Sequence, residues 1–347
     1  MRYRRLQRAG LDASEIGFGT WGLGGSHGGA VAYGPTDDRE SLRALRRAWE
    51  LGVTFYDTAD LYGHGHSEVL LGQALAEVRG RAVIATKAGF LNAEGAQDFA
   101  PRHLTAALEG SLRRLGTEYV DLFLLHSPPL DSLRSDPGPL RWLEDVKRSG
   151  RARAIGISVR SPDDGLTVVR ECALDAIQVN FNLADQRAAR NGLLDLCAER
   201  GVGVIVRTPL CFGFLTGAFA DPAGFDSSDH RSRWPAEQRA RWHQAAEVFA
   251  RFRADGGQTP AQFALRFCLS YPAVWTVIPG MLTAAQVEEN VRASDLGPLT
   301  AAELKQVEEV YDEREFFLGR EPGRQTRRPR GAPAGSRHDY AAASRAQ

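Results

Sequence analysis

The 347-residue chain is 43% hydrophobic and 25% charged, an ordinary composition for a globular protein. Its 43 basic side chains equal its 43 acidic ones, so we expect it to bind neither nucleic acid nor a membrane surface. The sequence has no run of about 18 apolar residues that could span a bilayer. No apolar segment follows the basic N-terminus, as one would in a signal peptide. We therefore expect a cytoplasmic protein.

The end of the chain differs in charge from the rest. Residues 319–347 hold seven arginines and two acidic residues, a net charge of +5, so residues 1–318 carry −5. This segment is rich in Arg, Pro, Gly and Ala and has no apolar periodicity, which predicts a basic disordered tail. We expect it to be a solvated chain end; contact with an acidic partner is the alternative.

Short apolar runs alternate with helical patterns through residues 1–318, which favours parallel strands joined by crossover helices. In about 300 residues this α/β alternation fits a closed (β/α)8 TIM barrel, although a doubly wound open sheet would alternate in the same way. We expect an N-terminal β-hairpin, residues 3–6 with 14–17, to plug one end of the barrel. The predicted strands are residues 53–57, 82–87, 119–125, 154–158, 176–180, 202–206 and 274–278, with a weak eighth near 293–296.

One connection is too long for a strand–helix link. It runs from Gly213 to about Trp234, and long structured loops in compact domains usually have a function. Its residues 229–234 either shape the choice of substrate or pack against the barrel.

Residues 17–22 (GFGTWG) match the G-x-G-x-x-G pattern of dinucleotide-binding folds. That fingerprint must open a helix, because the pyrophosphate binds free backbone N–H groups there. More glycines and a proline follow here instead. We therefore favour a loop over the barrel mouth, with Trp21 as a wall of a substrate pocket.

Four reactive side chains lie at or just after the ends of three successive predicted strands. Asp57, Lys87 and His126 end the strands, and Tyr62 follows Asp57 by five residues. Each has a structural alternative. Asp57 could cap the next turn and Tyr62 could pack as a ring. Lys87 could extend its charge to solvent, and His126 could be a hydrogen-bonded histidine of the core. Because the chemistry of such barrels lies at the carboxyl ends of strands, their joint occurrence favours a catalytic site.

The four residue types suit proton donation from a phenol. A free Tyr, with a pKa of about 10, is a poor acid near neutrality, and a neighbouring Lys⁺ lowers that pKa. Asp57 would keep Lys87 charged and in place, and His126 would orient the reacting oxygen. Such a group suits carbonyl reduction, in which Tyr62 protonates the developing alkoxide while a cofactor delivers hydride.

An ordered set of motifs carries a family resemblance over about residues 1–317. The chain resembles the aldo-keto reductases, nicotinamide-dependent oxidoreductases with a (β/α)8 barrel. The matching residues are 17–21 (GFGTW), 57–63 (DTADLYG), 67–68 (SE), 86–87 (TK), 121–126 (DLFLLH), 156–158 (GIS), 209–210 (PL), 213, 215–217 (LTG), 278–280 (IPG), 286 and 289–290 (EN).

The resemblance implies residue roles. It gives a catalytic tetrad of Asp57, Tyr62, Lys87 and His126, and it places Ser158 and Gln178 on the nicotinamide carboxamide. Apart from the resemblance, the places of Trp21 and His64 in loops at the barrel mouth lead us to expect that they border the substrate. The remaining cofactor contacts that the resemblance implies are Arg207 and Pro209, then Leu210, Gly213, Leu215, Thr216 and Gly217 along the pyrophosphate, and Gly280, Gln286, Glu289 and Asn290 at the adenosine end.

Three departures from the family pattern bear on the cofactor. Val159 follows Ser158 where an Asn is frequent, and Arg207 stands where many members stack a Tyr on the nicotinamide; a guanidinium can also stack. After the last predicted strand, Met281, Leu282 and Gln286 offer no charge for a 2′-phosphate. NADP is the family's usual cofactor and our expectation, with NAD as the alternative.

We therefore expect NAD(P)H-dependent, reversible reduction of a small aldehyde, ketone or sugar. The alternative is a nicotinamide-binding regulatory or scaffold subunit, as in potassium-channel β subunits. We expect no metal: His64 and His66 lack a further ligand set, and Cys172, Cys197, Cys211 and Cys268 are too scattered for a C-x-x-C site or a disulfide framework. Nothing in the sequence indicates an oligomeric state.

Overall fold

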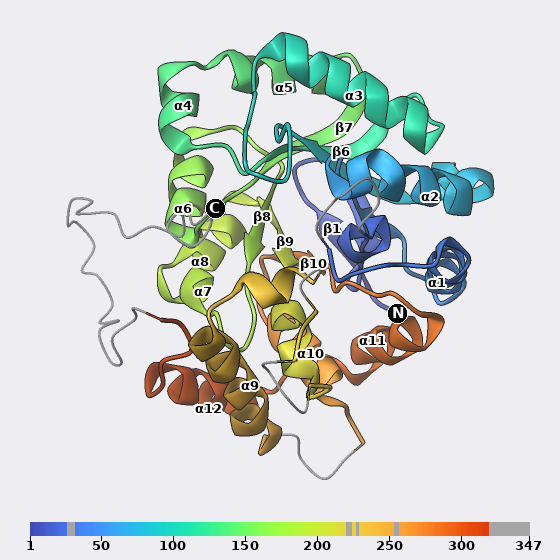
Figure 1. Ribbon diagram of the computed structural model, residues 1–347. Helices are drawn as coiled ribbons and strands as arrows, with labels where there is room; N and C mark the ends of the chain where they lie inside the picture. The colour runs from blue at the N-terminus through green and yellow to red at the C-terminus, as the bar shows by residue number, and fades with distance from the viewer. Residues whose placement is uncertain (26–31, 220–223, 227–228, 253–256, 319–347) are drawn as a thin grey trace.

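The computed structural model describes residues 1–25, 32–219, 224–226, 229–252 and 257–318. The predicted disordered tail, residues 319–347, lies outside the described residues. Within them, helices surround a ring of parallel strands (Figure 1). The strands pair in chain order, so each neighbour in sequence is also a neighbour in space. The barrel strands are β3 (Phe18–Gly19), β4 (Phe55–Asp57), β5 (Val83–Ala88), β6 (Val120–His126), β7 (Ala152–Ser158), β8 (Ala176–Asn180), β9 (Gly203–Arg207) and β10 (Val274–Val277).

The ends of this sheet meet beside β3. The Gly17 N–H donates to the Val277 carbonyl at 2.8 Å and the Gly19 N–H donates to the Pro279 carbonyl at 3.0 Å. A Cβ on Gly19 would lie 2.8 Å from the Ile278 carbonyl oxygen, so only glycine lets the two chains approach this closely. The closed barrel predicted from the sequence is confirmed.

The prediction of the eighth strand was wrong. Residues 293–296 belong to helix α11 (Ala284–Leu296), which buries Val287, Asn290, Val291 and Ser294 on one face. That spacing is helical, and a four-residue apolar fragment at its end carries no strand period of its own. The true eighth strand is β3, whose two residues lie within the glycine-rich segment that we interpreted as a loop.

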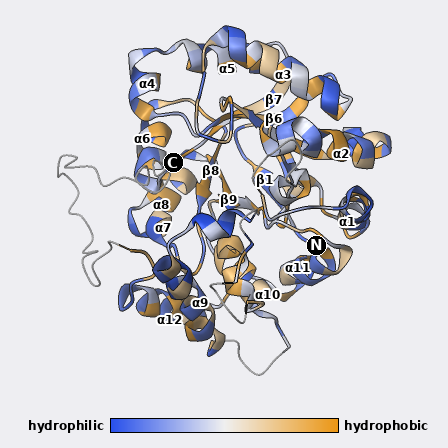
Figure 2. Cartoon of the chain, viewed as in Figure 1, coloured by the Kyte–Doolittle hydropathy of each residue, from blue (hydrophilic) through white to orange (hydrophobic). Residues whose placement is uncertain are grey.

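The helices cover the outside of the barrel, with hydrophobic residues concentrated toward the strands and hydrophilic ones outward (Figure 2). Caps fix several starts: the Asp37 side chain accepts from two N–H groups of α1, and Thr259 and Thr300 form capping boxes. None of the described helices is long and apolar enough to cross a bilayer. They are α1 (Asp38–Glu50), α2 (His66–Leu75), α3 (Pro101–Leu115), α4 (Leu130–Ser135), α5 (Gly138–Arg148), α6 (Pro162–Glu171), α7 (Arg187–Arg190), α8 (Leu193–Arg200), α9 (Ala236–Ala250), α10 (Pro260–Leu269), α11 and α12 (Ala301–Asp312).

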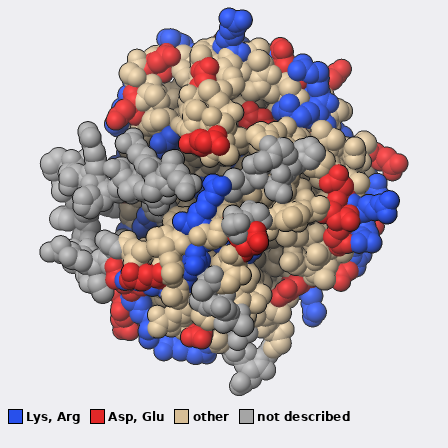
Figure 3. Space-filling model, viewed as in Figure 1, with Lys and Arg blue, Asp and Glu red and all other residues tan. Residues whose placement is uncertain are grey.

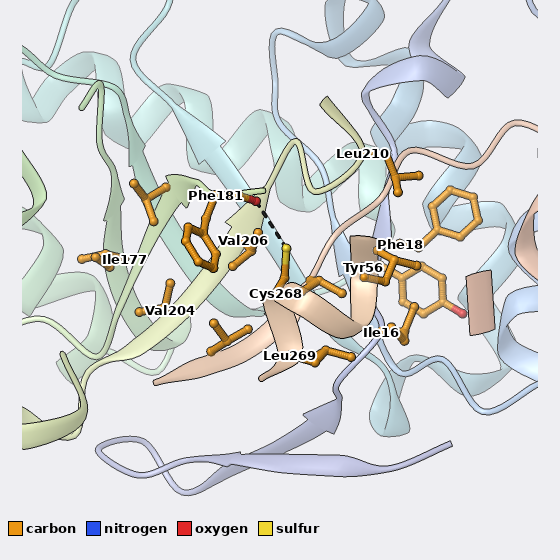
Figure 4. Close-up of a cluster of buried hydrophobic side chains, with 14 of the residues drawn as sticks. Ile16, Phe18, Tyr56, Ile177, Phe181, Val204, Val206, Leu210, Cys268 and Leu269 are labelled. Atoms are coloured by element: carbon orange, nitrogen blue, oxygen red, sulfur yellow. Dashed lines mark hydrogen bonds between the residues drawn. The ribbon is translucent and has the colours of Figure 1, made fainter. Parts of the chain in front are cut away.

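The core has two layers. The larger layer lies between strands and helices, where Cys268 of α10 donates its thiol to the Phe181 carbonyl at 3.5 Å beside Val204 and Val206 of β9 (Figure 4). The smaller layer fills the barrel interior and includes Leu6 and Phe55. Acidic and basic side chains are interspersed on the visible surface (Figure 3).

The N-terminal hairpin packs against the inner layer as predicted, but its second strand was placed too late: β1 (Tyr3–Leu6) pairs with β2 (Leu11–Ser14), not with residues 14–17. The chain reverses earlier because Gly10, with a φ of 64°, closes a short turn by donating its N–H to the Leu6 carbonyl at 2.8 Å. Leu6 and Leu11 join the interior cluster, and the Trp275 indole N–H of β10 donates to the Arg4 carbonyl at 2.9 Å. The hairpin therefore covers the amino ends of the strands and leaves their carboxyl ends for function.

One buried carboxylate ties the hairpin to the barrel. Glu15 is 2% exposed. It accepts from Arg2 Nε at 3.0 Å, from Arg4 Nε at 2.9 Å and from the Ser294 hydroxyl of α11 at 2.8 Å. Both arginines are more exposed than the carboxylate they hold.

We predict that Glu15→Gln lowers the free energy of unfolding by about 2 kcal/mol, because both arginines lose their shared counter-ion. Urea denaturation measures this loss. The matched control is Asp12→Asn in the same hairpin, whose pair with Arg5 is exposed on both sides and contributes about 0.5 kcal/mol or less. Equal losses in the two variants would contradict the role given to Glu15.

Candidate active site

Two of the predicted catalytic residues form a buried ion pair at the carboxyl ends of β4 and β5. Lys87 Nζ lies 2.6 Å from Asp57 Oδ1 and 2.7 Å from the Thr58 carbonyl. Lys87 is 0% exposed and Asp57 is 2% exposed. The strand register places both residues at one rim, because parallel strands end on the same side of the barrel.

Tyr62 and His126 complete the predicted group. Tyr62 begins the turn η3 (Tyr62–Gly65), and Lys87 Nζ lies 4.9 Å from the centre of its ring. The Tyr62 and His126 rings lie 5.9 Å apart and nearly perpendicular, at 81°. The structure thus brings all four residues together, as the sequence predicted.

Burial and charge set the protonation states. Burial alone would lower the pKa of Lys87, but Asp57 and Tyr62 outweigh it and raise that pKa, so Lys87 stays charged. Burial, reinforced by Lys87 and Arg207, holds the pKa of His126 well below its usual value. His126 is therefore neutral at physiological pH.

The expected lowering of the Tyr62 pKa is not what the structure gives. Burial raises the pKa of Tyr62, and the opposing charges of Lys87 and Arg207 offset only part of that rise. Because desolvation penalises the phenolate more than one neighbouring cation stabilises it, Tyr62 is a protonated phenol at neutral pH.

The sequence missed a link from this pair to the proposed nicotinamide contacts. Gln178 Nε2 donates to Asp57 Oδ2 at 2.7 Å, and Gln178 Oε1 accepts from the Ser158 hydroxyl at 3.2 Å. Both side chains are 1% exposed. The Ser158 oxygen and Gln178 Oε1 can each still accept a hydrogen bond, which complements the NH2 group of a carboxamide, and Gln178 Nε2 keeps a second N–H that can donate.

Arg207 ends β9 at the same rim. Its Nη2 donates to the Val159 carbonyl at 3.1 Å. Its charge acts on Asp57, Tyr62 and His126, so it belongs to the electrostatics of the site.

The other predicted cofactor residues fall in two places. Pro209 and Leu210 follow β9 and are buried, and the 3-10 segment η5 (Cys211–Thr216) comes next. Gly213 and Gly217 there have φ values of 91° and 72°, in the left-handed region that favours glycine. The Thr216 hydroxyl donates to the Gly213 carbonyl at 2.7 Å, and Leu215 is buried.

The second place follows β10. Gly280 is exposed, and a Cβ there would meet only Tyr33, at 3.9 Å. Gln286, Glu289 and Asn290 lie on α11. Gln286 Oε1 accepts from the Leu282 N–H at 2.7 Å, so that side chain already closes its own turn.

The two predicted substrate-pocket residues have different surroundings. Trp21 starts the 3-10 segment η1 (Trp21–Gly24), which packs closely against the turn of Tyr62. The approach is so close that a Cβ on Gly24 would lie 2.9 Å from the Tyr62 carbonyl carbon. His64 is exposed, with a φ of 52°, on that turn. Neighbouring His66 bonds to Asp38 Oδ1 at 2.8 Å.

Sequence reasoning missed an aromatic wall beside Trp21. The Trp21 ring lies 4.6 Å from His230 and 5.0 Å from Tyr33. His230 is buried, and burial lowers its pKa to about 4. The segment 229–234 therefore packs against the barrel mouth; its Asp229 caps η6 (His230–Arg233). Packing against the barrel was one of the two alternatives predicted for this segment, but the sequence did not indicate that Trp21 and Tyr33 would be the partners of His230.

Phe90 was also missed. Its ring lies 4.8 Å from His126, at 89°.

Across the described residues no group of three or more His, Cys, Asp or Glu side chains is arranged to hold a metal ion.

Comparison with known families agrees with this geometry. Residues 15–312 match the model described as the Aldo/keto reductase family. The chain belongs to this family. It is 32% identical, over 92% of its length and 94% of the relative's, to L-glyceraldehyde 3-phosphate reductase of Escherichia coli. It is 30% identical, over 88% and 94%, to a probable voltage-gated potassium channel subunit beta of Oryza sativa.

Among solved structures, the glycerol dehydrogenase AKR11B4 from Gluconobacter oxydans superimposes with a TM-score of 0.74. The two are 29% identical, and the match covers 89% of this chain and 94% of that one. Relatives with different named roles thus match most of this chain, and its substrate has to be argued from its own site.

We predict that Asp57→Ala destabilises the protein by about 3–5 kcal/mol, because Lys87 is left buried without its counter-ion. The wild-type pair contributes stability below the unfolded-state Lys pKa of about 10.4, and this is lost as pH rises through the raised folded-state pKa. In Asp57→Ala the folded-state pKa of Lys87 falls instead, so stability rises with pH toward 10.

Urea denaturation from pH 7 to 10 measures both effects. The double variant Asp57→Ala/Lys87→Met serves as the control, because it removes the stranded charge and is expected to recover much of the loss. A single variant as stable as wild type, with no dependence on pH, would refute the buried charge pair.

Proposed function

We propose that this oxidoreductase uses NADPH to reduce an aldehyde or ketone to its alcohol, reversibly, with Tyr62 as the general acid. The observation that carries the proposal is the placement of the protonated Tyr62 phenol between charged Lys87 and neutral His126. An oxidoreductase family with a donor of this kind needs a substrate oxygen that takes up a proton.

The protein's residues divide the work. Lys87, kept charged by Asp57, stabilises the phenolate that Tyr62 becomes when it gives its proton to the substrate oxygen. Neutral His126 orients that oxygen through a hydrogen bond and adds no second positive charge to the rim. Alcohol oxidation is the reverse, with Tyr62 as base.

The cofactor would be held by the residues described above. Ser158 and Gln178 would accept from the carboxamide, η5 and Gly217 would lie along the pyrophosphate, and Gln286, Glu289 and Asn290 would face the adenosine. When bound, the nicotinamide supplies the hydride. Trp21 and the segment around His230 would wall the substrate. The cytoplasmic location and the small-molecule partner stay predictions of the sequence.

We predict that Tyr62→Phe lowers kcat for carbonyl reduction by about 100-fold or more, since general acid catalysis contributes 10²–10⁴. Cofactor affinity should stay within about twofold, because the ring is retained. Oxidation of the reduced cofactor with a panel of aldehydes, ketones and sugars measures turnover. Tyr3→Phe, at the opposite end of the barrel, is the matched control and should keep full activity.

Retention of wild-type turnover in Tyr62→Phe would refute its role as acid. Cofactor binding by the wild-type chain without turnover on any substrate would instead support the regulatory alternative and contradict the reductase.

We predict that Ser158→Ala weakens cofactor binding by about tenfold, the value of one buried hydrogen bond. Fluorescence titration of the protein with NADPH and with NADH measures this loss and the cofactor preference together. We expect tighter binding of NADPH. Equal affinity of wild type and Ser158→Ala for both cofactors would remove Ser158 from the proposed site, and tighter binding of NADH would overturn the NADP assignment.

A further inference from the structure

The loop from Gly89 to Phe99, which follows β5, reaches across to the end of β6. Phe90 pairs with Gln97 across it in an antiparallel bridge, and the Asp98 N–H donates to the Gly89 carbonyl at 2.9 Å. The Phe99 ring lies directly beneath Gly89, where a Cβ would approach it to 2.1 Å. The loop is therefore a closed, packed turn.

Gln97 uses its amide to hold the main chain of the catalytic histidine. Its Nε2 donates to the carbonyl of His126 and to the carbonyl of Ser127, both at 3.1 Å. Through these two bonds Gln97 ties the loop after β5 to the main chain at the end of β6.

Arg160, two residues beyond β7, binds both the Ser127 carbonyl and the Gln97 side chain. Its Nε donates to the Ser127 carbonyl at 2.7 Å, and its Nη2 donates to Gln97 Oε1. Gln97, Arg160 and Ser127 thus form a closed circuit of hydrogen bonds that joins the loops following β5 and β7 to the end of β6.

The backbone of His126 and Ser127, which these hydrogen bonds hold, has a conformation that its surroundings must impose. Ser127 has a φ of 57°, which a residue other than glycine rarely adopts and which persists only where its surroundings impose it. The His126 ring has no polar restraint at Nδ1, a buried atom without a hydrogen-bond partner. The ring packs nearly perpendicular to the rings of Phe90, on the same loop as Gln97, and of Tyr62.

We propose that Gln97 and Arg160 are positioning residues that fix His126 in the orientation needed to align the substrate carbonyl with Tyr62. The proposal rests on the reductase function proposed above. The Gln97 amide acts on the His126 backbone, while Phe90 on the same loop acts on the ring. A shift of about 1 Å at a reacting group costs on the order of 100-fold in rate.

The decisive comparison is between Gln97→Ala and Gln97→Glu. Both remove the amide donor, but Glu keeps an acceptor for Arg160 and adds an ion pair with it. If the donor positions His126, both variants lose kcat, by about tenfold or more, with the cofactor Kd unchanged. If Gln97 merely ties the loop to Arg160, Gln97→Glu keeps wild-type kcat, which would overturn the proposal.

Two readouts separate positioning from loss of folded protein. The primary deuterium isotope effect on kcat, with cofactor deuterated at the transferred position, should rise in both variants as hydride transfer becomes slower. In the cofactor-free protein, the NMR signal of the His126 Cε1–H, assigned with His126→Asn, should shift. An unchanged isotope effect together with an unmoved signal would refute the proposal.

One control is Asn92→Ala, at the tip of the same loop, where Asn92 Oδ1 accepts the local Ala96 N–H at 3.0 Å. The other is Gln73→Ala, exposed on α2. Both should keep wild-type kcat. If Gln97→Ala fails to fold, Gln97→Glu decides alone. Wild-type turnover distinguishes the two proposals: its absence refutes the reductase, whereas wild-type turnover that persists in both Gln97 variants refutes only the positioning role.

Discussion

The site depends on one interaction, the ion pair between Asp57 and Lys87 inside the mouth of the barrel. Two fully desolvated charges are costly, and their attraction offsets that cost only with good geometry and further hydrogen bonds. Here the Thr58 carbonyl and the Gln178 amide supply those bonds. The pair keeps a positive charge beside Tyr62 in a place that would otherwise favour the neutral amine. Burial keeps Tyr62 protonated and His126 neutral, and the Lys87 charge opposes the rise of the Tyr62 pKa and reinforces the fall of the His126 pKa.

The barrel can place the Asp57–Lys87 pair in its mouth because one end of the barrel is closed and the other carries the polar loops. At the amino ends of the strands, the hairpin and the buried Glu15 close the interior. Closure also requires Gly19, where a side chain would collide with the Ile278 carbonyl. The carboxyl ends are then free to carry polar residues in loops, and the strand register decides which of them meet.

Much of this could be predicted from the sequence. The apolar runs predicted seven of the barrel strands, and the polar residues at or just after three strand ends predicted the group of Asp57, Tyr62, Lys87 and His126. Each of these features is visible in a short stretch of sequence. β3 was missed because two residues among glycines carry no period, and residues 293–296 were mistaken for a strand because a short apolar fragment is ambiguous. The Gln178–Asp57 bond, the packing of His230 on Trp21 and the reach of Gln97 to His126 depend on loop paths that no local pattern encodes. Burial caused the error in the direction of the Tyr62 pKa, because proximity of a cation can be read from motifs whereas desolvation requires coordinates.

The influence of Lys87 on the proton donor is tested by the pH dependence of kcat/KM for carbonyl reduction in wild type and in Lys87→Met. The ion pair is proposed to stabilise the Tyr62 phenolate, so loss of the cation must raise the pKa of the phenol further. We expect Lys87→Met to be much slower, with an alkaline decline in rate that moves to higher pH than in wild type. A variant whose decline stays at the wild-type pH would show that Lys87 does not act on the proton donor.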